Sequence, residues 1–164
     1  RYISVTGVQT CALPIYRRHL ELARREIARG VALGLTPKEA TAGLIVLTSL
    51  RGEAAALDFA TILEDSFETL DPPPAQPLPS AAAGEAEANF RSYFGTIPQP
   101  LQQLMRLSPA SADAYYLMRR GSIDANPLSP KHGELLLLAI LAAGYSPMAA
   151  THVRGARNAG ATDE

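Results

Sequence analysis

Apolar residues recur at steps of three and four along most of the chain, the spacing that places side chains on one face of an α-helix. Residues 16–33 show this pattern at Leu20, Ala23, Ile27 and Val31. Gly34 follows and is expected to end this first helix, because glycine readily adopts the left-handed conformation that terminates many helices. The pattern therefore predicts a helix over this first stretch.

A strong helix start follows at residues 36–39, Thr-Pro-Lys-Glu. Thr36 suits the N-cap position, Pro37 the first helical position, and Glu39 completes a capping box. We expect this helix to run to about Leu50. It is apolar on most of its faces, which predicts a central position in a core.

The rest of the chain divides at a proline-rich stretch. A third helix is expected over residues 53–70, and residues 71–84 contain five prolines and a run of small residues, which is typical of a linker. Further helices are expected over 85–94, 101–107, 109 to about 120, 130–143 and 147 to about 158, with a loop over 121–128 and with Ser129 and Ser146 as caps.

Composition favours a soluble, all-helical domain of ordinary size. The chain has 164 residues, of which 47% are hydrophobic and 19% charged, and alanine and leucine dominate. The net charge is −1 without a basic stripe, so we expect no nucleic-acid partner. The longest apolar stretch, residues 135–143, is too short to cross a bilayer. No signal peptide is evident, so a cytoplasmic location is expected.

The first fifteen residues are expected to be non-native. The run from Val5 to Ile15 resembles the translation of a common sequencing-library adapter, so residues 1–15 are set aside before the fold is considered. Cys11, the chain's one cysteine, falls in this run. The sequence from Tyr16 onward therefore offers no thiol for a disulfide, a metal site or a nucleophile.

Two short segments suggest a weak internal repeat. Residues 34–39, Gly-Leu-Thr-Pro-Lys-Glu, and residues 160–164, Gly-Ala-Thr-Asp-Glu, are similar helix starts. Each follows a helical stretch that contains a histidine, His19 in the first case and His152 in the second. The distances from histidine to glycine differ by seven residues, close to two helical turns, so the helix faces would be preserved.

The second half of the chain carries the clearest motif. Residues 128–144 read Leu-Ser-Pro-Lys-His-Gly-Glu-Leu-Leu-Leu-Leu-Ala-Ile-Leu-Ala-Ala-Gly, and residues 152–162 read His-Val-Arg-Gly-Ala-Arg-Asn-Ala-Gly-Ala-Thr. Together they resemble the core motif of the carboxymuconolactone decarboxylase family. The resemblance implies an all-α fold of the alkylhydroperoxidase D-like type, with a glutamate on one helix and a histidine on the next.

The chain departs from the peroxidase branch of that family. The branch carries Cys-x-x-Cys ahead of the histidine, where this chain has Tyr145 and Met148. The decarboxylase branch also lacks these cysteines and has a similar stretch around the histidine, matched here by His152, Arg154, Gly155, Ala156 and Asn158. The resemblance therefore favours the decarboxylase branch.

The resemblance also implies a domain organisation. Residues 16–70 resemble the C-terminal half of one repeat, 71–84 form the linker, and 85–164 resemble the N-terminal part of a second repeat. The chain would then be part of a longer tandem-repeat protein. Because the two halves are complementary, we expect that they can pack together as a single permuted domain.

Two residues are the candidates for catalysis. By resemblance, His152 is the proton donor and Glu134 its orienting or basic partner. Each has a plain structural alternative: a helix-dipole position for Glu134 and a hydrogen-bonded structural role for His152. Arg154 is a candidate clamp for a substrate carboxylate, and Tyr145 a candidate hydrogen-bond donor to substrate. The alternative for Arg154 is a solvated position on its helix, and the alternative for Tyr145 is packing at a helix junction.

The function implied by the resemblance is that of a lyase that decarboxylates a small carboxylated lactone. Such a reaction needs neither metal nor cofactor if the lactone carbonyl accepts the electrons released with carbon dioxide. The expected partners are the small-molecule substrate and further copies of the chain in a homo-oligomer. The alternatives are thiol-based peroxide reduction, which requires a thiolate, and a non-catalytic repeat that serves assembly.

Overall fold

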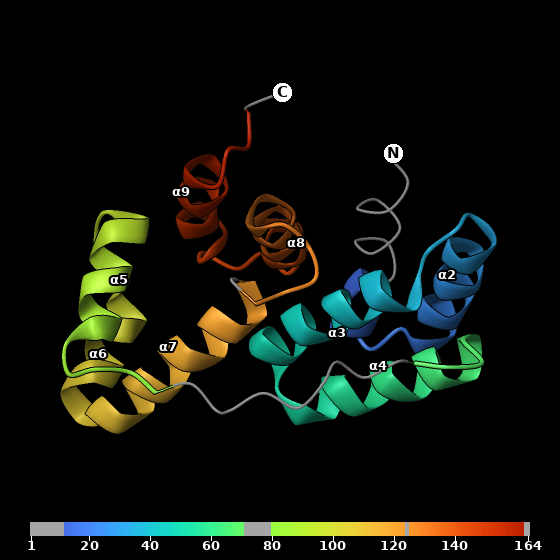
Figure 1. Ribbon diagram of the computed structural model, residues 1–164, viewed down its shortest axis with the longest axis horizontal. Helices are drawn as coiled ribbons and strands as arrows, with labels where there is room; N and C mark the ends of the chain where they lie inside the picture. The colour runs from blue at the N-terminus through green and yellow to red at the C-terminus, as the bar shows by residue number, and fades with distance from the viewer. Residues whose placement is uncertain (1–11, 71–79, 124, 163–164) are drawn as a thin grey trace.

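The computed structural model describes residues 12–70, 80–123 and 125–162. Within these ranges the regular secondary structure is helical and no strand occurs, which confirms the all-α expectation. The longer helices are α2 (Leu20–Ala32), α3 (Pro37–Arg51), α4 (Glu53–Ser66), α5 (Glu85–Phe94), α6 (Gln99–Leu107), α7 (Pro109–Ile123), α8 (Pro130–Ala143) and α9 (Ala149–Asn158) (Figure 1). No helix in these ranges is both long and apolar enough to traverse a bilayer.

The start of α3 confirms the predicted capping box. The Thr36 side chain accepts a hydrogen bond from the Glu39 backbone N–H, and the Glu39 carboxylate accepts one from the Thr36 backbone N–H, with Pro37 at the first position. Gly52, with φ of 74°, separates α3 from α4 in a conformation that favours glycine. The two helices then pack against one another as an antiparallel pair.

Helices α8 and α9 form the second closely packed pair. Ser129 caps α8 as predicted, because its side chain accepts a hydrogen bond from the His132 backbone N–H. Gly144 ends α8, and a short turn reverses the chain into α9. This arrangement places the two helices of the sequence motif side by side.

One hydrophobic core joins the two halves of the chain. It combines residues of α2–α4 with residues of the α7–α8 segment, among them Ala23, Ile27, Val46, Leu47, Phe59, Leu63, Ile123, Leu136 and Ile140. Asn126 links the halves further: its side-chain N–H donates to the Ala42 carbonyl at 3.1 Å, and its oxygen accepts from the Leu128 N–H at 2.8 Å. Residues from both sides of the predicted linker thus pack in one core.

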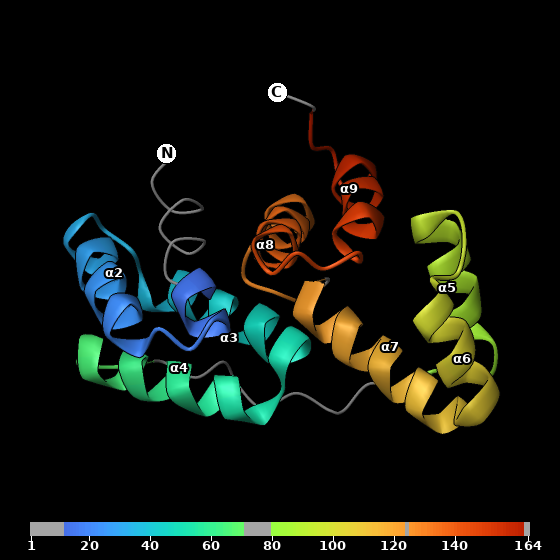
Figure 2. The same cartoon turned by 180° about the vertical axis from the view of Figure 1, so that it is seen from behind.

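A second, aromatic cluster holds the other end of the molecule together. Its buried members are Ala86, Phe90, Phe94, Ile97, Leu101 and Tyr116, from α5, α6, α7 and the turn between α5 and α6. Figure 2 shows α7 running from this end towards α3, with α8 and α9 above it. Helix α5 also packs on α9, and α8 packs on both α7 and α9.

Several helix boundaries differ from their predictions, including the starts of α2 at Leu20 and of α6 at Gln99. Helix α7 continues to Ile123 through residues predicted as a loop, because Ser122 and Ile123 are buried and Gly121 is tolerated inside the helix. Helix α4 ends at Ser66, where Phe67 turns to an extended conformation. Helix α9 begins at Ala149, since the Ser146 hydroxyl accepts from the Met148 N–H in the preceding turn.

The described part of the segment set aside as non-native lies against the first core. Residues 12–16 are helical, and Ala12 and Ile15 are buried. Residues 1–11 lie outside the described part of the chain, as do residues 71–79 of the predicted linker. The adapter origin of residues 1–15 and the division of the chain into repeats stay predictions.

Candidate active site

Glu134 and His152 come together at the contact between α8 and α9. Glu134 lies in the second turn of α8, on the face that turns inward, and its side chain is fully buried. His152 lies near the start of α9 and is 7% exposed. Its Nδ1 is 2.8 Å from Glu134 Oε2. Because the carboxylate accepts the proton of Nδ1, Nε2 is the ring nitrogen left for a ligand.

The close approach of the two helices depends on Gly155. A Cβ at this position would stand 2.5 Å from Glu134 Oε2 and 3.0 Å from a ring carbon of Tyr93. The Tyr93 hydroxyl in turn donates to the Gly155 carbonyl at 3.2 Å. Glycine therefore allows α9 to lie directly against the carboxylate and against α5.

Arg119 completes a buried cluster of three charged or titratable groups. It extends from α7, and one of its terminal nitrogens lies 2.8 Å from Glu134 Oε1. Both side chains are almost entirely buried, at 7% and 0% exposure. The guanidinium also stacks on the rings of Tyr93 and Phe94, 4.5 and 4.8 Å from their centroids. We refer to Arg119, Glu134 and His152 as the buried triad.

The sequence analysis did not identify Arg119. It is the first of two adjacent arginines near the end of a helix, a position more typical of solvent. The sequence signal that could have identified it is its spacing from apolar residues of the same helix. At steps of four, three, three and one, the buried positions of α7 are Ala112, Tyr116, Arg119, Ser122 and Ile123. An arginine on the apolar face of a helix requires a buried anionic partner, and here the partner is Glu134.

The triad borders a small polar cavity between α3, α7, α8 and α9. Its volume is about 20 Å³, space for on the order of one water molecule. It is lined by Ser49, Leu50, Tyr115, Met118, Arg119, Ser122, Leu137 and His152. Burial raises the pKa of the Tyr115 phenol, a trend that the nearby Arg119 charge opposes and the Glu134 charge reinforces. Tyr115 therefore remains a neutral hydroxyl near the triad.

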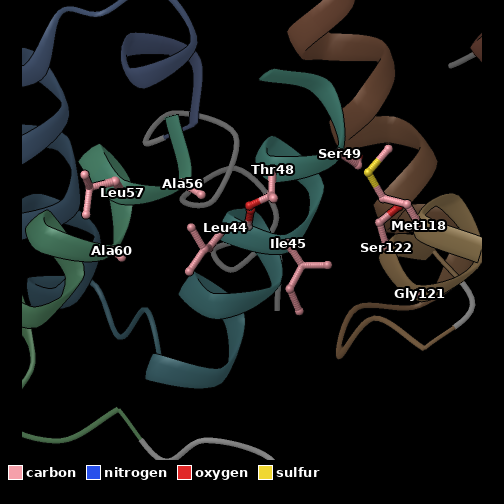
Figure 3. Close-up of a pocket in the computed structure, with 10 residues that line it drawn as sticks. All are labelled: Leu44, Ile45, Thr48, Ser49, Ala56, Leu57, Ala60, Met118, Gly121 and Ser122. Carbon is pink, nitrogen blue, oxygen red and sulfur yellow. The ribbon is translucent and has the colours of Figure 1, made fainter. Parts of the chain in front are cut away.

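A larger apolar groove adjoins this cavity (Figure 3). It lies on the surface between α3, α4 and α7, has a volume of about 610 Å³, and is lined by Leu44, Ile45, Thr48, Ser49, Ala56, Leu57, Ala60, Met118, Gly121 and Ser122. Ser49, Met118 and Ser122 line both the groove and the small cavity. The groove and the cavity that His152 lines are therefore neighbours that share part of their walls.

The other two candidate residues lie outside this cavity lining. Tyr145 is 91% exposed in the turn between α8 and α9, with φ of 52°. Arg154 is exposed. Its guanidinium lies against Gly95, where any side chain larger than hydrogen would collide with it. Their roles in substrate binding stay predictions. Within the described residues, no group of three or more histidine, cysteine, aspartate and glutamate side chains is arranged to hold a metal ion.

The fold and the site define an all-α protein with a carboxylate–histidine pair on adjacent antiparallel helices. The model of the carboxymuconolactone decarboxylase family matches residues 109–164, which span α7, α8 and α9 and include the whole buried triad. The matching model is that of the family which the motif of these residues resembles. The comparisons with curated proteins and with solved structures gave no significant match.

Proposed function

We propose that the protein is a lyase that decarboxylates a small carboxylated lactone by acid–base chemistry at His152. The observation that carries the proposal is the buried triad: Arg119, Glu134 and His152 are joined by two contacts of 2.8 Å at the edge of a cavity. Burying three such groups costs more free energy than burying apolar side chains of similar size, so a buried cluster of this kind is a candidate functional site.

In the proposed reaction the substrate's own carbonyl accepts the electrons. The bond between the ring carbon and the carboxylate breaks, carbon dioxide leaves, and the electron pair passes into the conjugated lactone carbonyl as an enolate. His152 in its protonated form then donates its Nε2 proton to a carbon of this enolate, which gives the product lactone. A proton from solvent restores the imidazolium.

Each neighbour of His152 has a distinct proposed role. Glu134 orients the ring through Nδ1 and stabilises the imidazolium form. Arg119 compensates the negative charge of Glu134 and binds its Oε1, so that Oε2 faces His152. Tyr115, as a neutral hydroxyl at the cavity, is placed to donate a hydrogen bond to the developing enolate oxygen.

The test is turnover of carboxylated butenolides by the full chain in D₂O. We expect release of carbon dioxide and incorporation of one deuteron per product molecule, and we expect His152→Gln to lower kcat by about 100- to 10,000-fold without changing the melting temperature. His132→Gln is the matched control, because this histidine lies in the first turn of α8 and does not line the cavity.

Two outcomes would contradict the proposal. Equal turnover in wild type and His152→Gln would remove the histidine from the chemistry. A wild-type chain that turns over none of the butenolides would favour the third alternative, a non-catalytic repeat that serves assembly. Peroxide reduction remains a separate alternative that requires a thiolate, and the positions of the family's cysteines hold Tyr145 and Met148.

A further inference from the structure

We propose that the apolar groove between α3, α4 and α7 binds the hydrophobic part of an amphiphilic carboxylate whose reacting end lies at His152. The inference rests on the proposed function and narrows its substrate class from a bare carboxylated lactone to one that carries an extended apolar substituent. Three independent features of the groove support it.

The first feature is the position of the groove next to the cavity that Arg119 and His152 line. The groove and the cavity share Ser49, Met118 and Ser122, which in Figure 3 lie together at one end of the groove, while Leu57 and Ala60 lie at the other. A ligand lying along the groove would therefore direct one end towards the cavity that His152 and Arg119 line. Met118 stands at the junction, and an unbranched, flexible side chain there can adapt to ligands of different shape.

The second feature is the chemistry of the lining. Seven of the ten lining residues are alanine, leucine, isoleucine, methionine or glycine. The other three are serine or threonine residues whose hydroxyl groups already donate hydrogen bonds to backbone carbonyls. Thr48 donates to the Leu44 carbonyl, Ser49 to the Val46 carbonyl and Ser122 to the Arg119 carbonyl, all in their own helices. The groove thus offers contact area for an apolar group, and its hydroxyl groups already donate within the protein.

The third feature is the difference in size between the two spaces. The cavity at His152, about 20 Å³, accepts a water molecule or one functional group of a substrate but no ring. The groove, about 610 Å³, falls within the ordinary range of small-molecule sites, roughly 300–1,000 Å³. A substrate whose reacting carbon reaches Nε2 must therefore leave most of its atoms in the groove. The buried Arg119 Nε, which lacks a hydrogen-bond partner, supplies a further donor at the cavity lining.

The experiment is a titration of the full chain with butanoate, octanoate and dodecanoate below their micellar concentrations. The chain has three methionines, Met105, Met118 and Met148, so ¹³C-methyl labelling gives three assignable signals, with Met118→Leu as the assignment control. We expect affinity to rise by about two- to four-fold for each added methylene, in line with apolar burial. We expect the Met118 signal to shift while those of Met105 and Met148 stay in place.

A matched pair of variants tests the location. Leu57 lines the groove and is 69% exposed, whereas Leu107 is 72% exposed and lies outside it. We expect Leu57→Asp to weaken dodecanoate binding at least ten-fold and Leu107→Asp to leave it unchanged, with both variants retaining the wild-type helical circular dichroism. Equal losses in the two variants, or affinity independent of chain length, would overturn the proposal.

Two further measurements distinguish this inference from its alternatives. Sedimentation analysis reports whether the groove is instead an interface between copies: a wild-type dimer that Leu57→Asp makes monomeric, with no Met118 shift on adding dodecanoate, would overturn it. His152→Gln should keep chain-length-dependent binding while it loses turnover. Turnover of small butenolides without any chain-length effect would leave the proposed function intact and defeat the groove assignment alone.

Discussion

At the scale of single residues, the central feature is a carboxylate held between an arginine and a histidine. Glu134 is fully buried, and each of its oxygens has its own contact: one with Arg119 and one with His152. A carboxylate in such surroundings is stable only while it is paired, because desolvation of an isolated charge costs several kcal/mol. The three side chains therefore form one energetic unit.

This coupling predicts a large effect when one partner of the ion pair is removed. Arg119→Met leaves the buried Glu134 carboxylate with His152 as its remaining partner and Oε1 without one, so we expect the free energy of unfolding to fall by about 3–5 kcal/mol. Adding Glu134→Leu should recover most of this loss, because no buried charge then remains. Arg154→Met, at an exposed arginine, is the control and should have little effect. Urea denaturation of wild type, Arg119→Met, Glu134→Leu, the double variant and the Arg154→Met control measures the coupling, and simple additivity of the two single losses would contradict it.

The buried phenol of Tyr115 predicts a pH dependence of stability. Burial raises its pKa above the ordinary value of 10, so the folded state holds this proton more tightly than the unfolded state does. Its contribution to stability is complete below about pH 10 and is lost as the pH rises towards the pKa of the folded state. We expect Tyr115→Phe to flatten the alkaline limb of a melting-temperature profile between about pH 9 and 11.

Tyr116 is the reference for this measurement. Its pKa is also raised, mainly by the hydrogen bond that its hydroxyl donates to Glu85, so part of the alkaline slope should remain in Tyr115→Phe. An alkaline limb unchanged by Tyr115→Phe would show that this phenol does not lose solvation on folding. The adjacent tyrosines thus report two different environments, one at the triad and one at the aromatic cluster.

At the scale of the elements, the distance between α8 and α9 sets the geometry of the site. We expect Gly155→Ala to displace α9 or the Glu134 side chain, since the new methyl would stand 2.5 Å from a carboxylate oxygen, and to cost about 1–3 kcal/mol. Gly121→Ala is the matched control, because this helical glycine has open space around it and alanine should stabilise the helix by about 0.5–1 kcal/mol. Thermal unfolding measures both; equal shifts would show that α9 tolerates a wider spacing.

Helix boundaries were predictable where local hydrogen bonds decide them. The capping box at Thr36 and the Ser129 cap involve residues three apart, so the sequence contains both partners of each interaction. The end of α7 was mispredicted because burial of Ser122 and Ile123, rather than any local signal, extends the helix past Gly121. Long-range packing overrides glycine's low helix propensity there.

At the scale of the whole molecule, the main prediction is that the two halves unfold together. Leu136 of α8 is fully buried in the core that also contains residues of α2–α4. We expect Leu136→Ala to lower the free energy of unfolding by about 2–5 kcal/mol. Hydrogen exchange should show lost protection in α3 and α4 as well as in α8. Protection in α3 and α4 that matched wild type would mean that the halves fold independently.

The sequence by itself determined the all-α class, most helix starts, the family resemblance of residues 109–164 and the two motif residues Glu134 and His152, because these depend on periodicity, on local caps or on a contiguous motif. Only the tertiary structure decided that Arg119 joins them and that the groove between α3, α4 and α7 opens beside His152. Both features combine residues that are far apart in the chain, and they exist only once hydrophobic packing has brought those segments together.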